Sequence, residues 1–155
     1  MDDCQRLTDT VERFSQFIDG FPASALMEQD WGPREVLAHL VYHHEVYVML
    51  VVGLLSGQPV APPQGRFSDL NAAAVAASRG IPTPELVARL RQANQRLVQL
   101  YREHDPAAII VEIKAGAKPR TLAKLLPEAE AHIRNHLQKL RRAAKAADRQ
   151  QRTGR

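Results

Sequence analysis

The chain has 155 residues, 45% of them hydrophobic, and a formal net charge of +4. This length allows one domain with a hydrophobic core, and the abundance of Ala, Leu, Gln and Arg favours helices. The single cysteine, Cys4, excludes a framework of internal disulfides. The acidic N-terminus is unlike the basic start of a signal peptide. The most apolar run, from Val46 to Leu55, is too short to span a membrane, which requires about 20 residues. We therefore expect a soluble, cytoplasmic, helical protein.

The positive charge is concentrated at the C-terminus. Between Lys139 and Arg155 there are seven Lys or Arg residues and one acid, Asp148, so this segment has a net charge of +6 and the rest of the chain about −2. Such a segment could contact nucleic acid phosphates, but no aromatic residues that could stack on bases are interleaved with it. We favour the alternative of a solvated helix end, where the helix dipole stabilises cations.

Hydrophobic spacing predicts two helices in the first part of the chain. The first covers residues 3–19 and is closed by Gly20 and Pro22. The second covers residues 33–56 and starts at Pro33, because proline is tolerated in the first turn. The apolar residues of the second helix extend well around its axis, so it should be the most buried of all. Those expected on its core face are Val36, Leu40, Tyr47, Val51 and Leu54, with Val41 and Val48 beside them.

A long connection should follow the second helix. Residues 57–67 hold three prolines and two glycines, which indicates a segment that crosses the bundle or borders a pocket. Beyond it, Ser68 or Asp69 can cap a short helix that ends at Ala77.

Two further long helices complete the predicted fold. The third covers residues 83–104, and the fourth covers residues 121–148, where Pro127 should kink the helix or mark a new start. Between them, residues 109–119 are rich in β-branched side chains and predict a short β-hairpin or an extended loop. The chain is therefore expected to be all-α, a four-helix bundle with one long crossover connection.

Two histidine pairs on different helices are the candidate functional residues. His132 and His136 are four residues apart, so they share one face of the fourth helix, at the edge of its core stripe. His39 and His43 occupy the matching edge of the second helix. If the two helices are neighbours, three or four imidazoles can meet there and bind Zn, Ni, Cu or Fe. The alternative is a set of boundary histidines that form hydrogen bonds with water or backbone.

Other side chains are expected to have structural roles. We favour ordinary packing for His44 and His104, and packing at the helix start for Trp31. Glu35 and Glu45 flank the histidines on the second helix but should face away from the site.

Several segments carry a resemblance to a known family. The second helix begins with Trp31-Gly-Pro-Arg-Glu-Val-Leu-Ala-His39-Leu40, the middle of the chain contains Asp69-Leu70-Asn71 and Pro84-Glu85-Leu86, and the last helix contains His132-Ile-Arg-Asn-His136-Leu137. Together they resemble the DinB-like superfamily of four-helix bundles, which includes the ClbS/DfsB branch and thiol-dependent transferases. The resemblance spans most of residues 3–142, which we take as the bundle domain, and leaves residues 143–155 as a basic, frayed or disordered tail.

The resemblance implies a site and a function. His39, His132 and His136 would bind a divalent metal, such as Zn, Ni or Fe, and a low-molecular-weight thiol would be the partner of a metal-dependent thiol S-transferase or hydrolase-like enzyme. The alternative is a non-catalytic, ClbS/DfsB-like protein that binds a small molecule and protects against stress. The resemblance also implies a homodimer. The short apolar run and the lack of aromatic residues in the basic segment argue against a membrane or nucleic acid as a partner.

Overall fold

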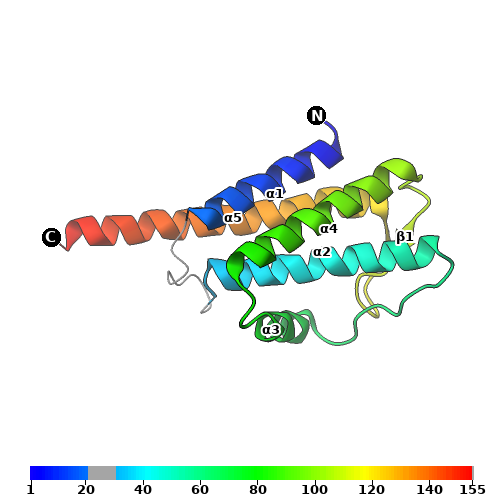
Figure 1. Cartoon of the computed structure of the whole chain (residues 1–155), viewed down its shortest axis with the longest axis horizontal. Helices are drawn as coiled ribbons and strands as arrows, with labels where there is room; N and C mark the ends of the chain where they lie inside the picture. Colours follow the sequence, from blue (N-terminus) through cyan, green and yellow to red (C-terminus); the bar gives the residue numbers. More distant parts are fainter. Residues whose placement is uncertain (21–30, 155) are drawn as a thin grey trace.

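The computed structural model describes residues 1–20 and 31–154, so the expected role of Pro22 lies outside the described residues, as does that of Arg155. The chain is mostly helical, with one small antiparallel sheet (Figure 1). In chain order the elements are α1 (Asp3–Asp19), α2 (Pro33–Leu55), α3 (Phe67–Ala77), α4 (Thr83–Glu103), β1 (Ile110–Val111), β2 (Arg120–Thr121) and α5 (Leu122–Thr153). The predicted all-α fold with a short hairpin is confirmed.

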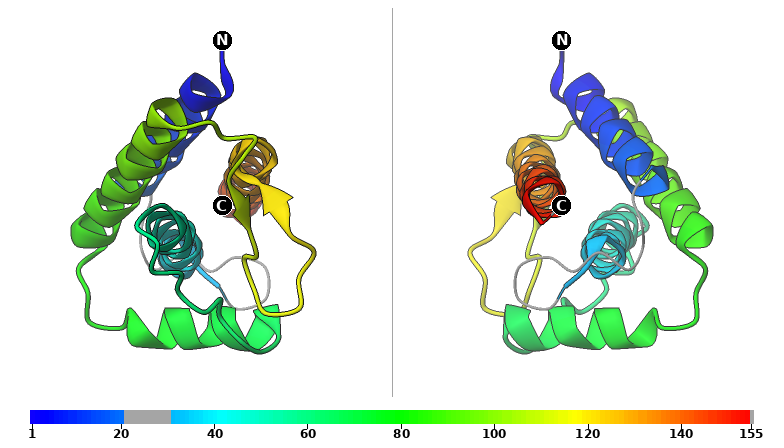
Figure 2. Two further views of the ribbon diagram at one scale, coloured as in Figure 1. Left: turned by 90° about the vertical axis from the view of Figure 1, so that its right-hand side faces the viewer. Right: turned by 90° about the vertical axis from the view of Figure 1, so that its left-hand side faces the viewer.

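The four long helices form the bundle, and α3 lies outside it. Helix α1 packs against α4 and α5, while α2 packs mainly against α4 and α3 and much less against α5. The end views show α3 running crosswise below α2 (Figure 2). None of the residues of α3 is buried. Because α2 and α5 contact each other so little, space for a pocket remains between them.

Helix α2 is the central helix of the core, as its apolar pattern predicts. Fourteen of its residues are buried, more than in any other helix of the described chain. The prediction for Leu54 was wrong, since this side chain is 43% exposed. It lies in the last turn, before a connection whose residues 57–61 are all exposed, so no element covers it. By length and composition α2 could cross a membrane, but 72% of its most apolar window is buried inside the bundle.

The long connection after α2 leads to α3, which lies outside the bundle (Figure 1). The N–H of Ala115, in the hairpin loop, donates to the carbonyl of Pro63 at 2.8 Å, so the connection is tied to the hairpin. Helix α3 starts two or three residues earlier than predicted, with Arg66 at the N-cap position in place of Ser68 or Asp69 and no side-chain cap. Ser68 and Asp69 are in the first turn, and Asp69 accepts a hydrogen bond from Arg66 instead of capping.

Helix α5 begins at the hairpin and runs past the end of the bundle. In the hairpin Ile110 pairs with Thr121, and the Thr121 side chain accepts the N–H of Lys124 at 3.3 Å to cap α5. The helix continues through Pro127 without a new start, because this exposed proline is only the sixth residue and leaves just one carbonyl without its helical partner. The helix extends to Thr153, beyond the predicted end.

Candidate metal centre and its pocket

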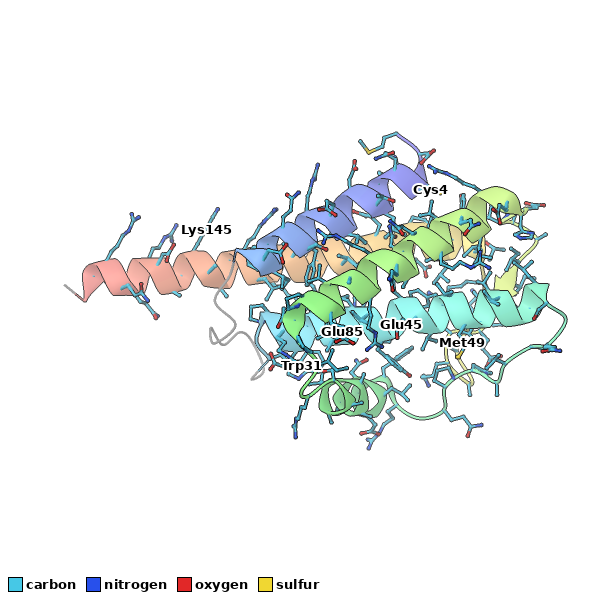
Figure 3. All side chains as sticks on the ribbon, viewed as in Figure 1. Cys4, Trp31, Glu45, Met49, Glu85 and Lys145 are labelled. Atoms are coloured by element: carbon cyan, nitrogen blue, oxygen red, sulfur yellow. The ribbon has the colours of Figure 1, made fainter. Side chains whose placement is uncertain are left out.

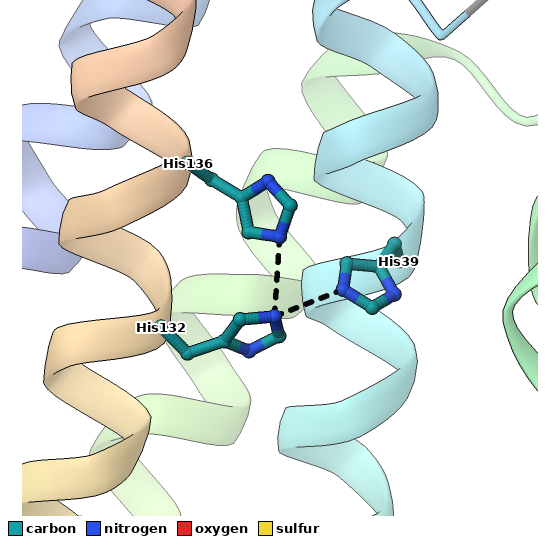
Figure 4. A group of neighbouring side chains, drawn as sticks. All are labelled: His39, His132 and His136. Atoms are coloured by element: carbon teal, nitrogen blue, oxygen red, sulfur yellow. Dashed lines mark hydrogen bonds between the residues drawn. The ribbon is translucent and has the colours of Figure 1, made fainter. Parts of the chain in front are cut away.

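Three of the predicted site residues lie together between α2 and α5. His39 comes from α2, and His132 and His136 come from successive turns of α5 (Figure 4). The Nε2 atom of His132 lies 3.1 Å from Nε2 of His39 and 3.1 Å from Nε2 of His136. One potential ligand atom from each ring falls within 4.8 Å of the others. Residues that are 93 positions apart in the sequence thus face one another, as predicted.

Hydrogen bonds alone account poorly for this arrangement. In a neutral imidazole, Nε2 carries either one hydrogen or one lone pair, so His132 cannot bond well to both neighbours through the same atom. Nitrogen ligands about 2.1 Å from a common ion lie about 3.0–3.4 Å apart for tetrahedral or octahedral angles. The two distances of 3.1 Å from Nε2 of His132 fall within this range, and the three ligand atoms all lie within 4.8 Å of one another. The cluster can therefore hold a divalent metal ion.

The three imidazoles are in the protonation state that a metal needs. Burial, together with the charges of His43, His132 and His136, lowers the pKa of His39 to about 3. Burial also lowers the pKa of His132 to about 4, with the neighbouring His136 adding to the shift. For His136 burial and then the charge of Lys139 lower the pKa to about 4. All three rings are neutral at neutral pH, so their lone pairs are free for coordination.

His43 lies beside the cluster and has a different partner. Its ring centroid is 4.6 Å from that of His39, and its Nε2 is 2.8 Å from Oδ1 of Asn71 on α3. Because an amide oxygen can only accept, this bond requires the hydrogen of His43 to be on Nε2. Sequence reasoning did not assign a role to Asn71. The only signal was its place in the segment Asp69-Leu70-Asn71, which resembles the family.

The cluster opens into a cavity of about 710 Å³. Its walls come from α2, α3 and α5, with contributions from Trp31 and from Ile113 after β1. The lining residues are Trp31, Val36, His39, His43, Tyr47, Phe67, Ser68, Asn71, Ala72, Ile113, His132, His136, Lys139 and Leu140. No carboxylate occurs among these described residues. The pocket therefore combines apolar walls with hydrogen-bond donors and one cationic side chain, Lys139.

Trp31 is a pocket residue as well as a packing residue. Its ring centroid lies 5.5 Å from that of His39. The Nδ1 atom of His39 is buried and has no hydrogen-bond partner within residues 1–20 and 31–154. The His39 ring is therefore oriented by the contact of its Nε2 atom with His132 and by packing against Trp31, whereas no hydrogen bond within the described residues holds its Nδ1 atom.

The remaining candidate residues lie away from the pocket. Glu45 faces α4, where it accepts two hydrogen bonds of 2.7 Å from Arg89, as its predicted orientation requires. His44 is buried in the bundle, and this burial lowers its pKa to about 4. His104 is exposed at the C-cap of α4. None of these three residues lines the cavity.

The fold and the histidine cluster together define the class of the protein. A four-helix bundle with this cluster between its second and last long helices is a DinB-like helical domain, which confirms the resemblance seen in the sequence. The chain belongs to the family of mycothiol maleylpyruvate isomerase N-terminal domains, whose model matches residues 4–133. The match includes His39 and His132 and ends before His136. No curated protein and no solved structure matches the chain.

Proposed function

We propose that His39, His132 and His136 hold a divalent metal ion and that the protein is a metal-dependent enzyme that uses a low-molecular-weight thiol. The observation that carries the proposal is the convergence of three imidazoles at the wall of a large pocket, where Nε2 of His132 lies 3.1 Å from Nε2 of both His39 and His136. Three protein ligands leave a coordination position open for a substrate, which is typical of catalytic rather than structural sites. Zinc, nickel and iron all accept imidazole ligands.

The charge of the site favours an anionic sulfur ligand. Three neutral imidazoles would leave the double positive charge of the ion uncompensated, and no carboxylate lines the described pocket. A bound metal would lower the pKa of a coordinated thiol and so supply a thiolate nucleophile. The chain itself would exclude water with Trp31, Tyr47 and Phe67 and would position polar groups of the substrate through Asn71.

The family name narrows the kind of thiol. Because the family is named after a mycothiol-dependent isomerase, a low-molecular-weight thiol such as mycothiol is the proposed substrate, and thiol transfer or isomerisation is the proposed reaction. The cavity of about 710 Å³ falls within the range of pockets that enclose small molecules.

One observation favours a second function. The described lining contains no Asp or Glu, so a carboxylate general base is missing from the pocket walls. A protein that binds and sequesters a small molecule, without turnover, needs no such base. This is the non-catalytic alternative.

The first test is elemental analysis of protein purified without chelator, followed by titration of the cobalt form with a thiol. The enzyme proposal predicts close to one ion per chain and a sulfur-to-cobalt charge-transfer band when thiol is added. One ion per chain without this band would favour the binding alternative. Protein that contains no metal and takes up none would contradict the metal site itself.

A further inference from the structure

The pocket has two chemically different ends on either side of the histidine cluster. At one end Trp31 packs against His39, with a centroid distance of 5.5 Å. At the other end the ring centroids of Tyr47 and Phe67 each lie 6.2 Å from the ring centroid of His43. Helices α2 and α5 run antiparallel (Figure 1), so Lys139, which follows His136 on α5, lies toward the Trp31 end. One end therefore has Lys139 and an indole. The other end is formed by aromatic rings, and the Nζ atom of Lys114 lies 5.3 Å from the centroid of the Phe67 ring.

Lys139 differs from the other basic residues of α5. It lines the cavity, one turn beyond His136, whereas Lys145 lies outside the pocket and extends away from the bundle (Figure 3). No ion pair is formed by Lys139 within the described parts of the chain. Lys139 is exposed to solvent. An ammonium group at the wall of a pocket without carboxylates attracts a ligand anion.

A second donor faces the same pocket from α3. The Oδ1 atom of Asn71 is engaged by His43, which leaves the Nδ2 group of Asn71 without a protein acceptor among the described residues. Lys139 and the Nδ2 group of Asn71 thus offer N–H donors to a ligand in the pocket. A complementary ligand must bring acceptor oxygens, and it must also bring an apolar part for the end formed by Tyr47, Phe67 and Ile113.

We propose that Lys139 is a specificity-determining residue that binds the carboxylate of an amphipathic organic acid, with the apolar part of the acid directed past the histidine cluster. The inference rests on the proposed function, in which this acid is the reaction partner of the thiol. The volume of about 710 Å³ allows both molecules to share the pocket.

The test compares the binding of hexanoate with that of its neutral amide, hexanamide, which has the same length. The ligands are titrated into zinc-treated protein over the millimolar range, and the fluorescence of Trp31, the only tryptophan, reports occupancy. We expect hexanoate to bind more tightly than hexanamide. Lys139→Met should reduce the ratio of the two affinities by about twofold to fivefold, as expected for the loss of a solvent-exposed charge pair. Lys139→Arg should retain the ratio.

Lys145→Met is the matched control, because Lys145 is exposed on the same helix and lies outside the pocket. Its affinity ratio should equal that of the unchanged protein. The inference is overturned if hexanoate does not bind, or if Lys139→Met leaves the ratio unchanged or weakens both ligands equally. Zinc content is measured on the same samples. Zinc-free protein would count against the proposed function alone, because the effect of Lys139 on the affinity ratio can still be measured without the ion.

Discussion

The indole ring of Trp31 lies 5.5 Å from the imidazole ring of His39, and the two planes are inclined by 51°. This contact places the only tryptophan of the chain next to the proposed metal centre. The sequence indicated a packing role for Trp31 at the start of the second helix. In the folded chain the same residue forms one wall of the pocket.

The first prediction uses this contact as a reporter of metal binding. Copper(II) or cobalt(II) bound to the three histidines should quench most of the Trp31 fluorescence, because a paramagnetic ion with a partly filled d shell quenches a fluorophore in contact with its ligand. Zinc should bind without such quenching and should compete with cobalt. Quenching that persists in His132→Ala protein would show that the ions bind elsewhere.

The second prediction concerns the individual histidines. His39→Ala, His132→Ala and His136→Ala should each reduce metal affinity by at least about 100-fold, since even the loss of a residue that only orients a ligand costs 10–100-fold. His104→Ala, an exposed control, should retain the full metal content. The measurement is metal stoichiometry after dialysis against a weak chelator. Equal metal content in all four variants would exclude this ligand set.

The third prediction concerns the bond between His43 and Asn71. Asn71→Ala removes the acceptor of the half-buried Nε2–H group, so we expect the free energy of unfolding to fall by about 1–2 kcal/mol. Asn71→Asp keeps an acceptor and should restore most of this loss. Urea unfolding gives the values, with Asn135→Ala on the exposed side of α5 as the control. A loss of the same size in the Asn135 variant would contradict a specific role for the bond.

The fourth prediction is a pH dependence of stability that comes from His44. Burial lowers the pKa of this residue from 6.5 to about 4 in the folded chain. As the pH falls from 6.5 toward 4, the unfolded chain binds a proton at this residue while the folded chain does not, so stability falls. The contribution of His44 is present in full above pH 6.5, and it amounts to about 3 kcal/mol at most.

The slope of the unfolding free energy against pH gives the number of protons that the chain takes up when it unfolds. His44→Phe should lower this number by close to one between pH 6.5 and 4, because phenylalanine keeps an aromatic ring of similar size that does not titrate. The matched variant His104→Phe, at an exposed position, should leave the slope unchanged. The comparison is made by urea unfolding of metal-free protein at several pH values. Identical slopes in the His44 variant and the unchanged protein would rule out this source of pH dependence.

Much of the secondary structure was predictable because local signals specify it. The three- and four-residue spacing of Leu7, Val11 and Phe14 identifies α1, and Pro33 marks the first turn of α2. The four-residue spacing of His132 and His136 already places both rings on one face of α5. The boundary of the bundle domain at residue 142 stays a prediction, because α5 runs through this position without a break that would mark the end of a domain.

The sequence by itself determined which residues form helices, which faces are apolar and which histidines share an edge, because helical periodicity is a property of the local chain. Only the tertiary structure decided that α2 and α5 diverge enough to leave a pocket, that α3 brings Asn71 to His43, and that Lys139 faces the cavity while Lys145 does not. These relations depend on how helices distant in the sequence pack against one another. The sequence of one helix does not determine how far it lies from the helix beside it.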